Sequence, residues 1–340
     1  MRRGSLLQLV AIGAVCGVGA LLVALLIPWL PHAASEQAGR IDFVFWFVTI
    51  VSICIFALVA AVILYAVVKF RAAPDDDSDG PPIHGHTGLE IVWTAIPATL
   101  VTAIAIVSAV VLAKNEDVPH ASAATPLKPL VVDVTAQQFF WTFKYPGFKD
   151  LTSSTLKLPI DTPTRLRITS LDVTHSFWVP EFGQKLDAVP GSVNTLPITP
   201  DRLGTFPVIC TELCGLGHAL MRSQAEVMSS QKFLAWAKGG QKKGGGGTSG
   251  KALFASNGCD GCHTFKPAGS TAKVGPDLDK LPQEAQRAGK PLDDFIRESI
   301  VNPNAYLEPG FQPGIMPTTF KTLPKTQLDA LVSFLSRGKK

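Results

Sequence analysis

The chain has 340 residues, of which 46% are apolar and only 17% are charged. A typical soluble domain has about 25% charged residues, and three long apolar runs near the N-terminus account for the deficit. The net charge of +4 is too small to indicate nucleic-acid binding, and the length allows two or three domains. The composition therefore predicts membrane segments followed by ordinary soluble domains.

The first part of the chain, residues 1–35, is either a signal peptide or a first transmembrane helix. Its uncharged stretch follows Arg2 and Arg3, an arrangement that both kinds of segment share. Phe43–Val68 and Ile91–Ala113 are two further uncharged runs. Each exceeds the roughly 20 residues that a spanning helix needs. They predict a transmembrane hairpin over residues 41–114.

Positive charges set the orientation of this hairpin. Lys69 and Arg71 follow the first of its two runs, and such residues favour the cytoplasmic side of a membrane. The second run therefore leads outward, whether or not residues 1–35 are removed. We expect everything after about residue 114 to be extracytoplasmic.

Residues 125–238 carry a different pattern. Leu130–Thr135, Thr164–Thr169 and Thr205–Ile209 alternate between apolar and polar residues, which predicts strands. Pro and Gly punctuate the region at intervals of about ten residues, typical of a small β-sandwich or barrel. Ser229–Lys238 is a predicted closing helix.

The remaining chain predicts a linker and a separate unit. Residues 239–250 are rich in glycine, a composition typical of a flexible linker. Residues 251–340 form the last unit, and helical periodicity appears near both of its ends.

Cys210, Cys214, His218 and Met221 follow one another at intervals of four, four and three residues. Intervening glycines favour a loop around an ion. Zinc rarely takes a thioether, whereas thiolate, imidazole and thioether together indicate copper. Two thiolates are enough to bridge two copper ions, and a disulfide between them is the alternative.

A dinuclear copper site needs a second imidazole. The extracytoplasmic β region offers His120 and His175 besides the histidine of the loop. His175 lies at the end of a predicted strand, whereas His120 precedes the first strand. We therefore expect His175 to be the remote ligand.

The loop is similar to the dinuclear copper (CuA) loop of cytochrome c oxidase subunit 2. The resemblance implies a cupredoxin-like Greek-key sandwich or barrel. It places copper ligands at the following positions: His175, Cys210, Glu212, Cys214, His218 and Met221. It also implies that Glu212 gives its main-chain carbonyl to copper and its carboxylate to a magnesium ion at the interface with subunit 1. From the residues alone, Glu212 reads as an ordinary exposed acid.

Two other segments carry the same resemblance. Gly88–Pro97 resembles the start of the family's second spanning helix, which implies that Glu90 lies at a proton entrance of subunit 1. A helix N-terminal acid stabilised by the dipole is the alternative. Gln137–Phe143 resembles the family's aromatic strand. Trp141 matches that pattern, while Phe139 stands where many members have tryptophan, and we expect electrons to pass near both.

Cys259-Asp-Gly-Cys-His263 is a C-x-x-C-H motif, which predicts covalent attachment of haem c through Cys259 and Cys262. His263 is the first axial ligand. Residues 251–340 contain one methionine, so Met316 is the predicted second ligand. The Gly275-Pro276 and Met316-Pro317 pairs resemble small bacterial cytochromes c, which implies an all-α, class I-like domain.

The combined pattern predicts the electron-entry subunit of a proton-translocating cytochrome c oxidase in a bacterial plasma membrane. It passes electrons from haem c to CuA and on to subunit 1. The resemblance implies membrane lipid, subunits 1 and 3, and a quinol–cytochrome c reductase or a small cytochrome c donor as partners. A CuA-containing subunit of a nitric oxide reductase is the alternative. A copper-delivery protein does not explain the covalent haem.

Overall fold

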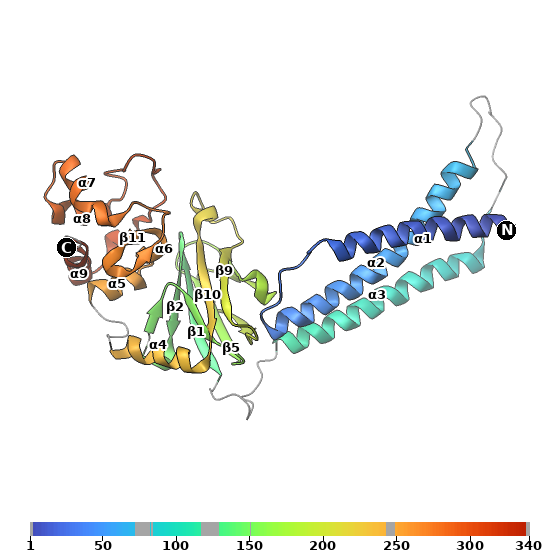
Figure 1. Ribbon diagram of the computed structural model, residues 1–340, viewed down its shortest axis with the longest axis horizontal. Coiled ribbons are helices and arrows are strands. Elements are labelled where there is room, and N and C mark those ends of the chain that lie inside the picture. Colours follow the sequence, from blue (N-terminus) through green and yellow to red (C-terminus); the bar gives the residue numbers. More distant parts are fainter. Residues whose placement is uncertain are drawn as a thin grey trace. The chain divides into compact units, whose positions relative to one another are not determined.

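The computed structural model (Figure 1) describes residues 3–71, 82, 84–116, 129–149, 151–242 and 249–337. The chain divides into two compact units, and each is described by itself. One unit holds Met1–His32 and Gly39–Asn115, and the other holds Ala33–Ala38 and Glu116–Lys340. His120 lies outside the described residues.

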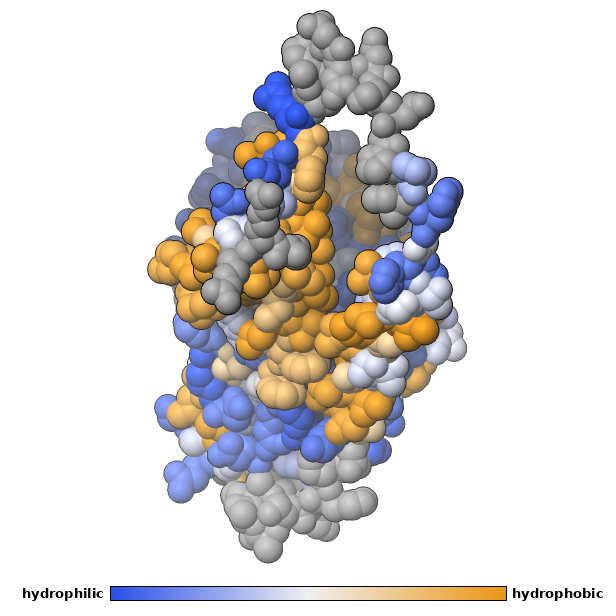
Figure 2. All heavy atoms as spheres, turned by 90° about the vertical axis from the view of Figure 1, so that its right-hand side faces the viewer, coloured by the Kyte–Doolittle hydropathy of each residue, from blue (hydrophilic) through white to orange (hydrophobic). Residues whose placement is uncertain are grey.

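The first unit consists of long apolar helices. They are α1 (Arg3–Leu26), α2 (Glu36–Lys69) and α3 (Thr87–Glu116), and each is long and apolar enough to cross a membrane. Their side chains are largely exposed, and Figure 2 shows apolar residues (orange) running along them. Gly13 and Gly17 bring α1 close to α2, because a Cβ there would lie within 3.5 Å of Ala61 and Ala57. Small residues allow such close helix packing in a bilayer.

The second unit begins with a β-sandwich of two five-stranded sheets, ordered β3-β2-β1-β5-β8 and β4-β10-β9-β6-β7. The strands are β1 Leu130–Gln137, β2 Phe140–Tyr145, β3 Leu151–Ser153, β4 Leu156–Pro159, β5 Thr164–Ser170, β6 His175–Trp178, β7 Lys185–Ala188, β8 Asn194–Ile198, β9 Gly204–Cys210 and β10 Arg222–Met228. The β1–β5 and β4–β10 pairs are parallel, and the other pairs are antiparallel. The predicted strands and the cupredoxin-like sandwich are confirmed.

Alternation along the strands builds the core of this sandwich. In β2, Trp141, Phe143 and Tyr145 point inward and are at most 1% exposed, as a two-residue period requires. Helix α4 (Ser230–Lys242) covers one end, where Phe233 and Trp236 pack on Tyr145. The sandwich therefore has a closed apolar core, and its strands are joined by hydrogen bonds to one another.

The predicted linker differs from the structure at both ends. Helix α4 continues to Lys242, and α5 already begins at Gly250. A glycine inside a helix costs about 1 kcal/mol, and here Gly240 lies against Leu151, where a Cβ would come within 2.6 Å of that side chain. Residues 243–248 lie outside the described residues.

The last region is a small helical domain with an apolar core. Its elements are α5 Gly250–Ser256, α6 Cys259–Cys262, β11 Thr264–Phe265, β12 Ser270–Thr271, α7 Leu281–Arg287, α8 Leu292–Val301 and α9 Lys325–Leu335. Helices α5 and α9 cross closely, because Gly250 meets the Ala330 carbonyl oxygen where a Cβ would lie 2.2 Å away. The rings of Phe254, Phe265 and Phe334 pack together beside this crossing.

Candidate copper and haem sites

The candidate copper loop runs between two neighbouring strands. Cys210 ends β9 and Met221 directly precedes β10, and these strands pair antiparallel. The Cys210 N–H donates to the Met221 carbonyl at 3.3 Å. The sheet therefore fixes both ends of the loop, so little conformational entropy remains to be lost when an ion binds.

The sulfur and nitrogen donors converge at this loop. The Cys214 sulfur lies 3.9 Å from the Cys210 sulfur and 3.8 Å from Met221 Sδ. His175 Nδ1 is 3.8 Å from the Cys210 sulfur, and His218 Nδ1 is 3.6 Å from the Cys214 sulfur. Both cysteines are free thiols. The structure thus brings together the predicted side-chain donors, and their soft sulfur and imidazole chemistry fits copper.

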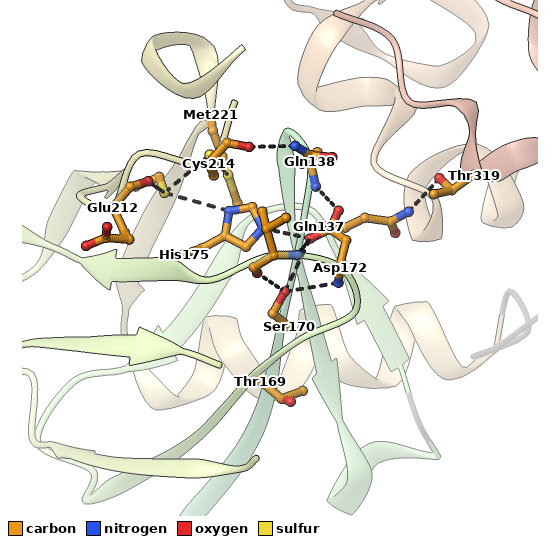
Figure 3. A network of polar contacts seen from close by, with 12 residues as sticks. Gln137, Gln138, Thr169, Ser170, Asp172, His175, Glu212, Cys214, Met221 and Thr319 are labelled. Carbon is orange, nitrogen blue, oxygen red and sulfur yellow. Dashed lines mark hydrogen bonds and ion pairs between the residues drawn. The ribbon is translucent and has the colours of Figure 1, made fainter. Parts of the chain in front are cut away.

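A second layer of hydrogen bonds orients these donors (Figure 3). His175 Nε2–H donates to Asp172 Oδ1 at 2.9 Å, which leaves the Nδ1 lone pair facing the sulfurs. Asp172 Oδ2 accepts from the Gln138 N–H at 2.7 Å, and Gln138 Nε2 donates to the Cys214 carbonyl at 2.5 Å. Partners of this kind fix the tautomer of a ligating imidazole.

The two thiols have very different acidities. Burial opposes ionisation of Cys210, but its interactions with His175 and the main chain outweigh burial and lower its pKa to about 7. Burial and the neighbouring Cys210 charge raise the pKa of Cys214 to about 12. At neutral pH Cys214 therefore stays protonated without a metal, and a bound cation favours ionisation of both sulfurs.

Three more predicted residues lie in the loop or beside it. The Glu212 carbonyl oxygen lies 3.3 Å from the Cys210 sulfur, while the Glu212 side chain is exposed. Phe139 packs over Gly215 and Gly217. Trp141 is 1% exposed, and its ring centroid lies 6.2 Å from that of His175 in an edge-on arrangement. Both aromatic residues are thus close to copper donors.

The C-x-x-C-H segment opens onto a cavity of about 460 Å³ in the helical domain. Cofactor sites typically have volumes of about 300–1,000 Å³. Cys259, Cys262, His263 and Met316 all line it. Most other wall residues are apolar, among them Phe254, Phe295, Ile296, Ile300, Phe320 and Leu331. Size, lining and the four predicted residues together fit a haem.

His263 is held in a form that can bind iron. Its Nδ1–H donates to the Pro276 carbonyl at 2.8 Å, so Nε2 keeps the lone pair that can bind iron. Burial lowers the pKa of His263, which keeps the ring neutral as ligation requires. Gly275 packs on the ring, where a Cβ would come within 2.6 Å. The Gly275-Pro276 pair therefore positions this ligand.

Glu90 lies in the first turn of α3, as predicted. Its Oε1 accepts a hydrogen bond from the His86 N–H at 3.0 Å, and His86 Nδ1 accepts one from the Leu89 N–H at 3.1 Å. This reciprocal arrangement is a helix N-terminal cap. The contact supports a capping role and leaves the predicted proton-entry role of Glu90 as a proposal.

Sequence reasoning missed two residues that orient the donors, Gln138 and Asp172, and one that lines the cavity of the helical domain, Phe140. Asp172 stands three residues before His175, and a carboxylate close to a ligating histidine is a usual orienting partner, so a signal was present. Gln138 had none, because its amide reaches the loop only through folding. Phe140 has the same inside–outside parity as Thr142 and Lys144, which marks it as an outward-facing aromatic residue.

Three family models match consecutive parts of the chain. The transmembrane domain of cytochrome c oxidase subunit II matches residues 21–111, the periplasmic domain of that subunit matches 151–228, and cytochrome c matches 248–339.

Individual proteins are similar over longer stretches. Cytochrome c oxidase subunit 2 of Synechocystis sp. is 32% identical over 247 residues, which cover 61% of this chain and 74% of that one. The protein of the same name from Alkalihalophilus pseudofirmus is 30% identical over 300 residues, covering 84% of each chain. The periplasmic domain of subunit II from Bradyrhizobium japonicum is 28% identical, with a TM-score of 0.34 over 37% of this chain and 99% of that structure. With its three apolar helices, its copper-type sandwich and its cytochrome c domain, this membrane protein belongs to the cytochrome c oxidase subunit 2 family.

Proposed function

We propose that this chain is the electron-entry subunit of a cytochrome c oxidase, in which the fused cytochrome domain receives electrons and the copper domain delivers them to subunit 1. One observation carries the proposal. Leu216 and Leu220 belong to the copper loop, and both also line the cavity that contains His263 and Met316. Residues between the copper donors thus form part of the haem cavity wall, so the two sites lie side by side.

In the copper domain, the thiolates of Cys210 and Cys214 and the imidazoles of His175 and His218 would hold the copper pair. Met221 and the Glu212 carbonyl would be the weaker ligands. When bound, the copper pair supplies a one-electron store whose charge is shared over two metals. The chain orients the donors through Asp172 and Gln138 and excludes water, since both cysteines are 4% exposed and Met221 is fully buried.

In the cytochrome domain, Cys259 and Cys262 would attach haem c, and His263 and Met316 would hold its iron. When bound, the haem supplies a one-electron carrier. The apolar cavity excludes water from it. Burial, with the Asp260 charge, raises the pKa of Cys262 to about 11.

The same proposal gives a role to two acidic residues, Glu212 and Glu90. The Glu212 carboxylate, which points away from the buried donors, would bind magnesium shared with subunit 1. Glu90 would deliver protons toward subunit 1 from the cytoplasmic side. Replacing Glu90 with Gln should then slow turnover while the copper and haem spectra stay unchanged, and wild-type turnover would leave only the capping role.

The proposed partners are subunits 1 and 3, membrane lipid, and a quinol-oxidising complex or small cytochrome c as donor. The copper and cytochrome domains would lie outside a bacterial plasma membrane. Oxygen consumption by the purified complex, with a difference spectrum, tests this assignment against nitric oxide as the acceptor.

Stopped-flow reduction by the physiological donor tests the route. Haem reduction should precede copper reduction, and the second step should be independent of protein concentration, because both sites belong to one chain. If a Cys262→Ser variant without a working haem still accepts electrons at the full rate, the copper is reduced directly and the proposed entry point is wrong.

A further inference from the structure

Phe140 lies on the outer face of the sandwich and is nevertheless buried. Inward-facing residues of β2 are Trp141, Phe143 and Tyr145, so the two-residue period puts Phe140 on the other face with Lys144. Phe140 is only 8% exposed. The side chains that cover it belong to the hydrophobic core of the cytochrome domain, and the Phe140 ring is part of that core.

Two contacts hold this ring within the cytochrome domain. It stacks on Phe320, with centroids 6.4 Å apart and planes inclined by 20°. It also lies over Gly258, the residue before the haem-attachment Cys259, where a Cβ would come within 2.2 Å of the ring. Gly258 has a φ of +68° as well, so a side chain at this position is excluded twice.

The neighbouring ring points to the other cofactor. Phe139 covers Gly217 of the copper loop, where a Cβ would lie 2.3 Å from the ring. Gln138 and Phe139 form the short connection between β1 and β2, and Gln138 is hydrogen-bonded to the Cys214 carbonyl. Two adjacent phenylalanine rings therefore each pack over a glycine. Phe139 covers Gly217 beside the copper donors, and Phe140 covers Gly258 beside the haem attachment.

Hydrogen bonds flank the aromatic contact. Gln137 Nε2 donates to Thr319 Oγ1 at 2.6 Å, and Ser154 Oγ donates to Asp260 Oδ2 at 2.6 Å. Figure 3 shows Gln137 and Thr319 meeting next to the network that holds His175. The contact thus joins the orienting residues of the copper site to the cytochrome domain.

We propose that Phe140 is the anchor that docks the cytochrome domain on the copper domain, so that the two remain associated even without the covalent link between them. The occupant of the Phe140 surface is this chain's own cytochrome domain. The inference deepens the proposed electron-entry function and rests on it only for the kinetic consequence, because docking itself is measured without electron transfer. The aromatic stack carries no charge, and the one carboxylate in these contacts, Asp260, is paired with a neutral hydroxyl, so docking should depend little on salt.

The test places a protease site in the Gly-rich run 244–247 of the full chain in the assembled oxidase. After cleavage, the haem-bearing fragment should co-elute with the oxidase on size-exclusion chromatography in detergent, at both low and high salt. In the Phe140→Ala variant the fragment should elute separately, with association weakened about 30-fold or more, as for the loss of an interface hot spot. Val193→Ala, which removes a 62% exposed side chain from the same sandwich, is the matched control and should co-elute.

A second variant protects the test against misfolding. Thr319 is exposed on the cytochrome side, so Thr319→Arg should leave the haem spectrum intact while its bulk obstructs docking, and its fragment should also be released. Release of the wild-type fragment on cleavage would overturn the proposal, because the link alone would then hold the domain. Retention of both the Phe140→Ala and the Thr319→Arg fragments would overturn the role of Phe140. If direct copper reduction disproves the entry role, the elution result still stands.

Discussion

The proposed copper donors lie on a sandwich whose strands are hydrogen-bonded to one another, whereas the proposed haem donors line a cavity between short helices. Cys210 ends a strand, Met221 precedes the next, and the apolar core beneath them is complete. In the cytochrome domain the described α-helices range from four residues in α6 to 11 in α9. Helices shorter than about 12 residues are marginal alone.

This difference assigns different structural roles to the two cofactors. A copper pair would be added to a domain that is already folded. The haem would fill a cavity of about 460 Å³ that apolar side chains enclose, and without it those side chains lose their packing partners. The haem is therefore expected to be part of the core of its domain, and the copper is not.

The largest effect should follow from removing haem attachment. In a Cys259→Ser, Cys262→Ser double variant we expect the region 249–337 to lose cooperative unfolding and become sensitive to protease, while the sandwich stays protected. Limited proteolysis of the full chain with mass spectrometry of the fragments measures this. Equal protection of both regions in the variant would refute the contrast between the two domains.

Removal of copper should have a large chemical effect and a small structural one. Segment 120–238 should bind two copper ions per chain by metal analysis, and Cys210→Ser should abolish the pair while circular dichroism still shows a folded sandwich. Met221→Leu should keep both ions and shift the potential, because the thioether is the weak ligand. One bound zinc ion instead of copper would show that the site has been misassigned.

An axial-ligand change should move one potential only. Met316→His should lower the haem reduction potential on the order of 100 mV, since methionine ligation raises it and axial ligands span about 0.8 V. The copper potential should not change. Redox titration followed by absorbance gives both values, and an unaltered haem spectrum in Met316→Ala would mean that another residue is the ligand.

The sequence could predict whatever depends on local pattern. Alternation in Leu130–Thr135 and Thr164–Thr169 predicted strands because one face of each must be buried. The copper loop and the C-x-x-C-H motif predicted the donors that they contain, and the structure brings the donors of each set close together. His175 and Met316 lie far from these motifs in the chain and were predicted because few other histidines and methionines were available.

Contacts between distant segments could not be predicted in this way. Gln138 reaches the Cys214 carbonyl only because the β1–β2 connection lies over the copper loop. Phe140 has an outward parity that indicates an exposed residue, and its burial depends on a domain more than 100 positions later in the chain. The closing helix was predicted to end at Lys238, but α4 continues to Lys242, and within this extension Gly240 lies against Leu151 of β3. Each miss comes from tertiary packing that no local period contains.

The smallest effect should come from an exposed ion pair that joins helices α8 and α9 of the cytochrome domain. Arg297 Nη2 on α8 donates to Asp329 Oδ1 on α9 at 2.6 Å, and Lys325 Nζ donates to Asp329 Oδ2 at 3.2 Å. The hydrogen bond from Arg297, followed by that from Lys325, lowers the pKa of Asp329 below its usual 3.8. A carboxyl with a lowered pKa stabilises the fold at pH values above its unfolded-state pKa, and this contribution is lost as the pH falls through the folded value.

Asp329→Asn should therefore lower the melting temperature of the haem-bound domain slightly at neutral pH. The difference from wild type should begin to shrink as the pH falls below about 4 and should disappear once the pH is below the lowered pKa of Asp329. Thermal melting followed by haem absorbance measures this, and Lys325→Gln, which removes only the longer of the two contacts, should have a still smaller effect. High salt should reduce both differences, because exposed charges are screened. A difference between Asp329→Asn and wild type that persists unchanged at low pH would mean that the substitution acts through packing between α8 and α9 and not through charge.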